Sequence, residues 1–504
     1  MHESGRRRHA KRALAILAGA LMLCWPAIYN RYPLLFPDSL SYIGDGGGVA
    51  RAVFMHRFVH EYGIRSLVYA LGIFPFHWRG NPWPIIGLHA LLTASMLWLV
   101  VRSVTPRRIV PVYLAITAVL AVVTSASWYA SLIMPDILGP LLYLGIFLLV
   151  FARETLSRRE RLVVALVACW AVASHVTHLM LGAMICAALL LLLARSSFRR
   201  HARGVAEVLA ILVIATAAQI VLNAYLYGQP TLDVRRPPYL MARVLADGPA
   251  RVYLQQHCPA LHWVLCDHVA NLPHNDDDFL WSDSSIWSIS SPAQQQQLRR
   301  EEMPLVLATI RAYPREQVAR SLDNAWLQLT NFDVNDFDAD PWVESAIDDP
   351  LPGASAHYAL SREAHSALPE ALFSNIHFWA VVLSLPVIAI MLLWRRNPRL
   401  IALTAIVIPT IVCNAALTGI LSDVDGRYQS RVVWLIPLLA LLAIASVIDR
   451  QPQPPRTASK LDTWSSCSTT TTASPTTSSS TWASWARRSS SSATTRSRPK
   501  KSSP

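Results

Sequence analysis

Charged residues are scarce in this chain of 504 residues. Asp, Glu, Lys and Arg together make up 15% of it, whereas apolar residues make up 53%. Soluble domains carry about 25% charged residues, so the composition departs from theirs in the direction of a membrane protein. The sequence also lacks a compact basic domain with interleaved aromatic residues. Its net charge of +13 therefore does not indicate a nucleic-acid partner.

Long apolar runs account for much of what the sequence does contain. A bilayer core of about 30 Å needs roughly 17 to 25 apolar residues per helix. The first run covers about residues 13–29, and no small-residue cleavage site follows it, so we expect a retained span rather than a signal peptide. Nine further spans are expected at about 84–101, 109–126, 130–151, 162–174, 179–194, 204–224, 377–394, 399–421 and 431–448. The sequence therefore predicts an all-α polytopic membrane protein with about ten transmembrane helices.

Basic residues fall on alternate loops between these spans. The arginines that follow the second, fourth, sixth and eighth spans are Arg102, Arg107, Arg108, Arg153, Arg158, Arg159, Arg161, Arg195, Arg199, Arg200, Arg203, Arg395, Arg396 and Arg399. By the positive-inside rule, these loops and both termini lie in the cytoplasm, as in a bacterial inner-membrane protein. Counting residues 63–76 as a span would put the later arginines on the wrong side. We expect that stretch to form an amphipathic or re-entrant helix at the outer face.

The predicted spans divide the chain into four parts. Residues 1–224 form a seven-span module with a long first periplasmic loop, and residues 377–450 form a three-span module. Between spans seven and eight, residues 225–376 predict an outward-facing soluble segment of helices and long loops, with helical periodicity at 294–329. Residues 451–504 become rich in Ser and Thr, which predicts a disordered or out-of-frame tail.

Cysteines are few, and four of them, Cys24, Cys169, Cys186 and Cys413, lie in predicted spans as small apolar residues. Cys258 and Cys266 lie in the outward segment, where an oxidising compartment permits a disulfide. Two free thiols are the alternative. A zinc site with His257, His262 or His268 has suitable residue types but no usual zinc spacing. The sequence therefore favours the disulfide and predicts no metal site.

Charged and polar residues gather at the expected outer ends of three spans. The candidates are Asp38 and Arg57 after span one, Asp136 at the mouth of span four, and Arg427, Tyr428 and Arg431 before the last span. Ionisable residues at a membrane edge are costly and are functional candidates by default. A carboxylate can act as a general base, and arginine can bind a phosphate through two hydrogen bonds.

Each of these residues also has a purely structural explanation. The two aspartates could cap helices, and the two arginines could anchor the membrane interface. Because all of them fall on one face, we interpret Asp38 and Asp136 as catalytic and the others as substrate-binding.

Two histidines interrupt the apolar run between spans five and six. His175 and His178 are three residues apart and share a helix face. They could position a sugar or bind a metal, and a polar re-entrant turn explains them equally well. We keep both as substrate-binding candidates.

With these residues in place, the layout resembles the GT-C superfamily of polyprenyl-phosphate-sugar-dependent glycosyltransferases, which includes protein O-mannosyltransferases and the lipid A aminoarabinose transferase. Asp38 in PDSLSY is similar to the first-loop catalytic acid of that superfamily, and residues 51–76 to its surface helices. Asp136 in MPDIL is similar to the acidic residue of the second outer loop. Arg427, Tyr428 and Arg431 in GRYQSR resemble the late motif that contacts lipid phosphate.

The resemblance implies a transferase that moves a sugar from a polyprenyl-phosphate carrier to a periplasmic acceptor. Its partners would be the lipid bilayer and the polyprenyl-phosphate-linked donor, and its cofactor stays open, with a divalent cation as one option. One alternative is a transporter or flippase for a lipid-linked glycan, although no internal repeat supports it. Another is a non-catalytic cell-envelope assembly protein that binds a partner through residues 225–376.

Overall fold

The computed structural model describes residues 2–58, 63, 65–77, 80–232, 236–258, 260–394 and 397–448, with the side chains of residues 2–6, 8 and 394 left out. Throughout this part of the chain the secondary structure is helical, and no β-strand forms beyond an isolated bridge between Leu34 and Leu132. The predicted all-α class is therefore confirmed. The predicted tail at 451–504, like Arg395 and Arg396, lies outside the described residues.

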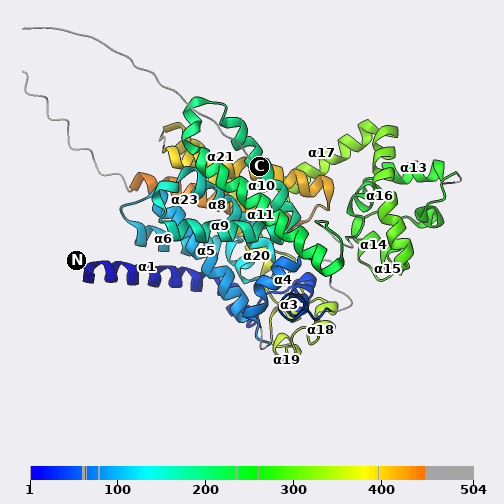
Figure 1. The fold of residues 1–504 in the computed structure, drawn as a ribbon, viewed down its shortest axis with the longest axis horizontal. Coiled ribbons are helices and arrows are strands. Elements are labelled where there is room, and N and C mark those ends of the chain that lie inside the picture. Colours follow the sequence, from blue (N-terminus) through cyan, green and yellow to red (C-terminus); the bar gives the residue numbers. More distant parts are fainter. Residues whose placement is uncertain are drawn as a thin grey trace, which may run out of the picture. The chain divides into compact units, whose positions relative to one another are not determined.

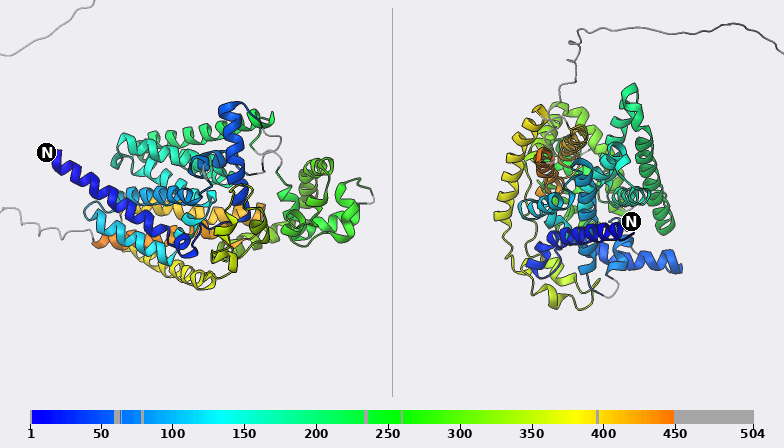
Figure 2. Two further views of the ribbon diagram at one scale, coloured as in Figure 1. Left: turned by 90° about the horizontal axis from the view of Figure 1, so that it is seen from below. Right: turned by 90° about the vertical axis from the view of Figure 1, so that its left-hand side faces the viewer.

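The long helices pack as a bundle (Figure 1). They are α1 (His2–Leu23), α5 (Trp83–Val104), α6 (Ile109–Val123), α8 (Leu138–Phe151), α9 (Arg158–Ser174), α10 (Val176–Leu192), α11 (Ala202–Tyr227), α20 (Glu370–Trp394), α21 (Pro398–Leu421) and α23 (Leu435–Ile448). Among the described residues, five segments are long and apolar enough to cross a membrane: 83–104, 196–227, 370–393, 398–421 and 426–448. The chain is accordingly a membrane protein. The bundle places the N-terminus of α1 and the end of α23 at one end (Figure 2).

Several of the predicted spans are broken near one end of the bundle. Residues 25–30 form a separate helix, α2 (Trp25–Asn30), and the fourth span begins with α7 (Ala126–Ser131) and the turn η2 (Pro135–Ile137). The last span begins with the short helix α22 (Gly426–Val433). Proline contributes to the first two breaks because its nitrogen has no hydrogen to donate. Backbone groups at two of the breaks bond to each other instead, since the Leu34 N–H donates to Ser131 O at 3.0 Å.

The loop after α2 carries two helices that cross each other. They are α3 (Pro37–Met55) and α4 (Leu67–Ile73), and the 3-10 turn η1 (Phe74–Phe76) continues α4. The crossing requires glycine at Gly46, because a Cβ there would lie 2.6 Å from the Ala70 carbonyl oxygen. α4 has seven residues and η1 has three, so the two together are about 15 Å long. That is half of a bilayer core, as expected for a surface or re-entrant segment.

Residues 236–369 form two groups of helices and one further helix, α17 (Pro314–Thr330), which lies between them in the sequence. The first, the α12–α16 group, comprises α12 (Tyr239–Asp247), α13 (Pro249–His257), the 3-10 helix η5 (Val264–Asn271), α14 (Asp276–Leu280), α15 (Ile286–Ile289) and α16 (Pro292–Ala312). It has its own core around Met241, Phe279 and Leu298, and it lies at the end of the bundle opposite the N-terminus (Figure 2). The helical pattern at 294–329 is two helices, since Pro314 starts α17.

The second group packs directly on the bundle. It contains α18 (Pro341–Ala346), α19 (Ser355–Tyr358) and the turn η6 (Glu363–His365), whose apolar residues join the main core. The buried carboxylate of Glu363 accepts hydrogen bonds from the Leu35 N–H and the Asn30 side-chain amide, both at 3.0 Å. In return, the Glu363 N–H donates to Asn30 Oδ1 at 2.8 Å. This exchange fixes the chain that leads from α2 into α3.

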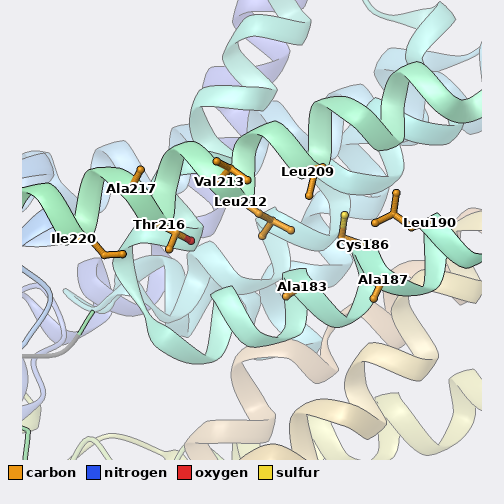
Figure 3. A pocket seen from close by; sticks show the side chains of 10 residues that line it. All are labelled: Ala183, Cys186, Ala187, Leu190, Leu209, Leu212, Val213, Thr216, Ala217 and Ile220. Atoms are coloured by element: carbon orange, nitrogen blue, oxygen red, sulfur yellow. The ribbon is translucent and has the colours of Figure 1, made fainter. Parts of the chain in front are cut away.

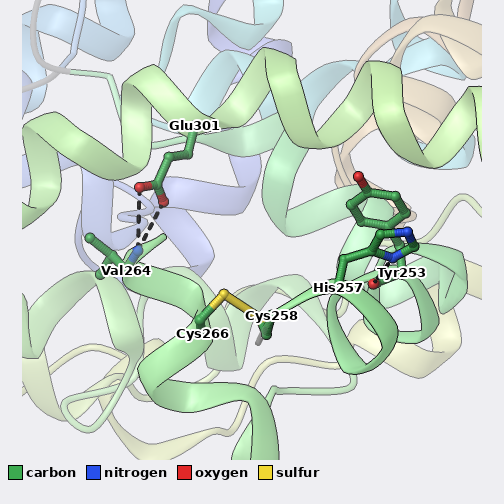
Figure 4. The surroundings of a disulfide bond; sticks show 6 residues. All are labelled: Tyr253, His257, Cys258, Val264, Cys266 and Glu301. Atoms are coloured by element: carbon green, nitrogen blue, oxygen red, sulfur yellow. Dashed lines mark hydrogen bonds between the residues drawn. A yellow bond between two sulfur atoms is a disulfide. The ribbon is translucent and has the colours of Figure 1, made fainter. Parts of the chain in front are cut away.

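Cys258 and Cys266 form a disulfide that joins the end of α13 to η5 (Figure 4). Their Cα atoms are 5.2 Å apart. Nearby, the Val264 N–H donates to both carboxylate oxygens of Glu301 in α16, at 3.3 and 3.2 Å. His257 instead stacks on Tyr253, with ring centroids 4.1 Å apart. Within the described ranges no group of three or more His, Cys, Asp or Glu is suited to a metal ion.

Loss of this disulfide should loosen the α12–α16 group. The bond spans a sequence separation of eight residues, and closing a loop of that size stabilises a fold by about 2–3 kcal/mol. We expect Cys258→Ser and Cys266→Ser to lower the denaturant midpoint for exposure of this group, measured by limited proteolysis in detergent. Cys413→Ser, at an unbonded cysteine, is the control and should leave the midpoint unchanged. Equal midpoints in all three variants would contradict the expectation.

The short length of α4 and η1 leads to a topology prediction. A reporter fused after Phe58 and one fused after Pro82 should lie on the same side of the membrane, because the helices that the structure describes between them, α4 and η1, are together too short to cross it. A reporter fused after Arg107 should lie on the other side, because α5 intervenes. Paired phosphatase and fluorescent-protein fusions measure this. Opposite sides for the first two fusions would mean that residues 63–76 cross.

Candidate functional site

Arg427 and Arg431 are one turn apart on α22, so they share a face of this helix. Asp425 caps the start of the helix, since its Oδ1 accepts a hydrogen bond from the Arg427 N–H at 2.8 Å. Both guanidinium groups are buried, and Arg431 is 2% exposed. Tyr428 lies between them, with its ring centroid 5.3 Å from each guanidinium carbon. The ring of Phe36 lies 3.8 Å from the guanidinium carbon of Arg427, a cation–π contact.

The described part of the chain supplies too few hydrogen-bond acceptors for the N–H donors of these two arginines. The Nε and Nη1 atoms of Arg427 and the Nε and Nη2 atoms of Arg431 are buried without a hydrogen-bond partner among the described residues. A buried donor of this kind costs free energy until an acceptor reaches it. Guanidinium pairs bind phosphate oxygens well because the bonds are charge-assisted and often bidentate. An anionic group is therefore the ligand that this pair suits best.

Asp136 is the carboxylate partner of Arg431. Arg431 Nη1 donates to Asp136 Oδ1 at 3.3 Å, and the aspartate is 2% exposed. It does not act as the N-cap of η2, because that position belongs to Met134. A buried carboxylate already bonded to an arginine is well placed to orient that arginine, and less well placed to take a proton from a substrate.

Asp38 lies in the first turn of α3 and forms an ion pair with Arg65, 2.6 Å between Oδ1 and Nη2. The N-cap of α3 is Phe36, so Asp38 is not the capping residue. Arg65 in turn lies over the ring of Trp281 in the α12–α16 group, 5.2 Å from its centroid. The pair thus holds Asp38 at the junction of the first loop with that group.

Tyr42 is buried in the same neighbourhood. Burial raises the pKa of its hydroxyl, and the charges of Asp38, Arg65, Asp136 and Arg427 all act on it. The structure therefore brings Asp38, Asp136, Arg427 and Arg431 to one neighbourhood, although they come from separate stretches of the sequence.

His175 and His178 lie at the break between α9 and α10. His175 Nδ1 accepts a hydrogen bond from the Thr177 N–H at 3.2 Å, so this residue caps α10. His178 is buried, donates through Nδ1 to Ala171 O at 2.9 Å, and has no partner at Nε2 in the described structure. A Cβ at Gly139, three residues after Asp136, would meet this Nε2 atom. The two histidines therefore form a polar turn between α9 and α10, and His178 also lies close to the segment that carries Asp136.

Arg57 is placed elsewhere. It follows α3 and is exposed, beside His56, whose Nδ1 is 2.8 Å from the Tyr225 hydroxyl of α11. The prediction that it binds substrate rested on its closeness in sequence to Asp38, but α3 carries it away from that residue.

Sequence reasoning missed two parts of the site. Arg65, a lone arginine before an apolar run, could have been suspected on its charge. The pair formed by Tyr69 and His89 has no such signal: the Tyr69 hydroxyl is 3.1 Å from His89 Nε2, and His89 Nδ1 donates to Leu132 O at 3.2 Å. This pair links α4 through α5 to the strand-like stretch that precedes Asp136.

The segment before α22 is held by the α12–α16 group and by α17. Arg243 of α12 contacts Asp247, Asp276 and Asp423 at 3.0 to 3.3 Å. Burial, together with the nearby charge of Asp423, raises the pKa of Asp276 to about 7. From α17, the Gln328 side chain donates to Asp425 O at 2.7 Å and accepts from the Asp425 N–H at 3.0 Å. The position of α22 therefore depends on these neighbours.

A separate apolar groove of about 500 Å³ lies between α10 and α11 (Figure 3). Its lining residues are Ala183, Cys186, Ala187, Leu190, Leu209, Leu212, Val213, Thr216, Ala217 and Ile220. None of them carries a charge. The groove is therefore not part of the charged site.

Taken together, the fold and the site define an all-α membrane protein with a buried pair of arginines next to two carboxylates. No protein-family model matches the chain, and no curated protein and no solved structure matches it either.

The buried pair of Asp136 and Arg431 should be sensitive to the loss of one partner. Arg431→Leu leaves the Asp136 charge buried and unpaired, which costs about 3–5 kcal/mol, whereas removing both charges costs less. We expect the Asp136→Asn, Arg431→Leu double variant to unfold at a higher temperature than Arg431→Leu alone, measured by thermal unfolding in detergent.

Arg399→Ala provides a matched control, since it removes a more exposed ion pair with Glu154 at 2.8 Å. Such a pair contributes about 1 kcal/mol or less. An Arg431→Leu protein as stable as this control would show that the buried pair carries no such cost.

Proposed function

We propose that the protein is a membrane glycosyltransferase of the GT-C type, which transfers a sugar from a polyprenyl-phosphate carrier to an acceptor. The observation that supports this most is the pair of buried guanidinium groups with unpartnered N–H donors on α22. A phosphate would supply the missing acceptors. Asp38 is also paired with an arginine, Arg65, but its side chain is 15% exposed, whereas that of Asp136 is 3% exposed. An acceptor hydroxyl can therefore reach Asp38, which supplies the carboxylate that transfer to a hydroxyl needs.

The proposed topology has ten spans and both termini in the cytoplasm of a bacterial inner membrane. It rests on the arginine-rich loops, which alternate with loops that carry the candidate site. In this arrangement the site and the α12–α16 group face the periplasm. A lipid-linked donor could then present its phosphate at the outer leaflet.

The proposed reaction forms a bond between the acceptor oxygen and the anomeric carbon of the sugar, and it breaks the bond from that carbon to the phosphate oxygen. Asp38 takes the proton of the acceptor hydroxyl as general base. The polyprenyl phosphate leaves with the negative charge, which Arg427 and Arg431 stabilise. Asp136 holds Arg431 for this role, and Tyr428, His175 and His178 contact the donor.

Transfer is preferred to transport because of where the charged residues lie. Transporters place their substrate sites near the middle of the membrane, on discontinuous helices. Here the buried charges gather where α3, η2 and α22 meet, beside the α12–α16 group.

The proposal predicts different defects for the acid and the arginines. Asp38→Asn keeps the shape but removes the proton acceptor, and the rate should fall by about 10²- to 10⁴-fold. Arg427→Ala should weaken donor binding and raise KM, since a phosphate contact acts in the ground state as well. The measurement is glycan modification in a deletion strain complemented with each variant.

Arg57→Ala is the matched control, because it removes an exposed arginine from the same loop and should complement fully. Protein levels are compared in parallel. Full complementation by Asp38→Asn at normal abundance would overturn the catalytic assignment and favour a transport or assembly function.

A further inference from the structure

The helix α17 has its polar and apolar faces arranged in reverse of a soluble helix. Its buried face carries Gln317, which donates to Asp247 Oδ2 at 2.6 Å, and Gln328, which holds Asp425. Its exposed face carries Val318, Leu322 and Trp326. These three are four residues apart, so they form one stripe. A helix surrounded by water would bury that stripe.

The stripe is among the most exposed apolar surface of the described chain. Leu322 is 64% exposed and Trp326 is 66% exposed. Isolated exposed apolar residues are ordinary, but a continuous stripe on one helix marks a surface that another apolar phase covers.

The position of α17 indicates what that phase is. Its C-terminal half packs along α21, which is long and apolar enough to cross a membrane. The approach is close, because a Cβ at Gly419 of α21 would lie 2.6 Å from the Asn324 carbonyl oxygen. Just after α17, Phe332 stacks on Phe378 of α20, with ring centroids 5.8 Å apart. The stripe therefore lies beside the ends of two membrane helices.

The residue order along α17 matches the polarity gradient of a bilayer edge. Arg315 is exposed in the first turn, three residues before Val318 and so on the same face. Trp326 comes last, nearest to α20 and α21, and α20 exposes a second tryptophan, Trp379, to 57%. Tryptophan is enriched at membrane–water interfaces, and arginine there reaches the phosphates.

We propose that the α17 stripe of Val318, Leu322 and Trp326 lies in the boundary between the headgroups and the acyl chains of the bilayer, with Arg315 at the phosphates. The segment between α11 and α20 is then anchored in the membrane through α17. Because Gln328 on the opposite face holds Asp425, this contact also fixes the start of α22. The inference does not depend on the transferase activity.

Photo-cross-linking of the full chain in lipid nanodiscs tests the contact. Leu322, Trp326 or Arg320 is replaced by p-benzoylphenylalanine, and the lipid is a mixture of phosphatidylethanolamine and phosphatidylglycerol. Arg320 is the matched control, since it is exposed on the same helix but is two residues from both Val318 and Leu322 and so does not share their face. We expect lipid adducts, detected by mass spectrometry, to be several-fold more abundant at 322 and 326 than at 320.

Limited proteolysis reports folding of the same segment, because a folded variant should resist cleavage between α11 and α20 as well as the unmodified chain does. In folded variants, equal adduct yields at 320 and 326, no adducts at all, or cross-links to a second copy of the chain would each overturn the proposal.

A second measurement avoids the bulky substitution. The fluorescence lost in Trp326→Phe, compared with the unmodified chain, is the signal of Trp326 itself. Lipids brominated near the headgroup end of the acyl chain should quench this difference signal more strongly than lipids brominated near the middle. Absence of quenching by either lipid would place Trp326 outside the membrane and contradict the proposal.

Discussion

The burial of two arginines on a helix of eight residues is the constraint on which much of this structure depends. A guanidinium group withdrawn from water needs compensation from a carboxylate or from hydrogen-bond acceptors. Asp136 supplies it for Arg431, and aromatic rings face both charges. The backbone of α22 is held equally firmly, because the Ser125 hydroxyl donates to Ser430 O at 2.6 Å and the Tyr129 hydroxyl to Arg427 O at 3.2 Å.

This constraint also explains why the helices break where they do. A continuous span would leave no room for polar side chains to meet, whereas the breaks at α2, η2 and α22 direct them to a common point. The broken backbone stays paired, since Ile133 N–H donates to Leu34 O at 3.1 Å and the Gln328 side chain bonds both backbone groups of Asp425. The breaks therefore bring the charged side chains together without leaving these backbone groups unpaired.

The sequence was informative about the helices and about charge. Hydropathy located the long helices because each must be apolar along its length, and the expense of charge at a membrane edge drew attention to Asp38, Asp136 and Arg431. It could not supply the pairing of these charges. Arg65 pairs with Asp38 although nearly all of α3 lies between them in the sequence. Gln328 reaches Asp425 across 97 residues with an uncharged side chain. Arg57 shows the converse limit, because it is close to Asp38 in sequence but is separated from it by the length of α3.

The exchange of hydrogen bonds between Glu363 and Asn30 has a consequence for the order in which the protein forms. The two residues are 333 positions apart, yet the chain leading to Asp38 depends on their contact. A ribosome needs on the order of tens of seconds to synthesise that distance. During this time the first helices are already synthesised, but residues 30–36 lack Glu363, which supplies both a hydrogen-bond acceptor and a donor to them. The acidic end of the site is thus completed late in biosynthesis, so a nascent or truncated chain would hold its arginines and its aspartates unassembled.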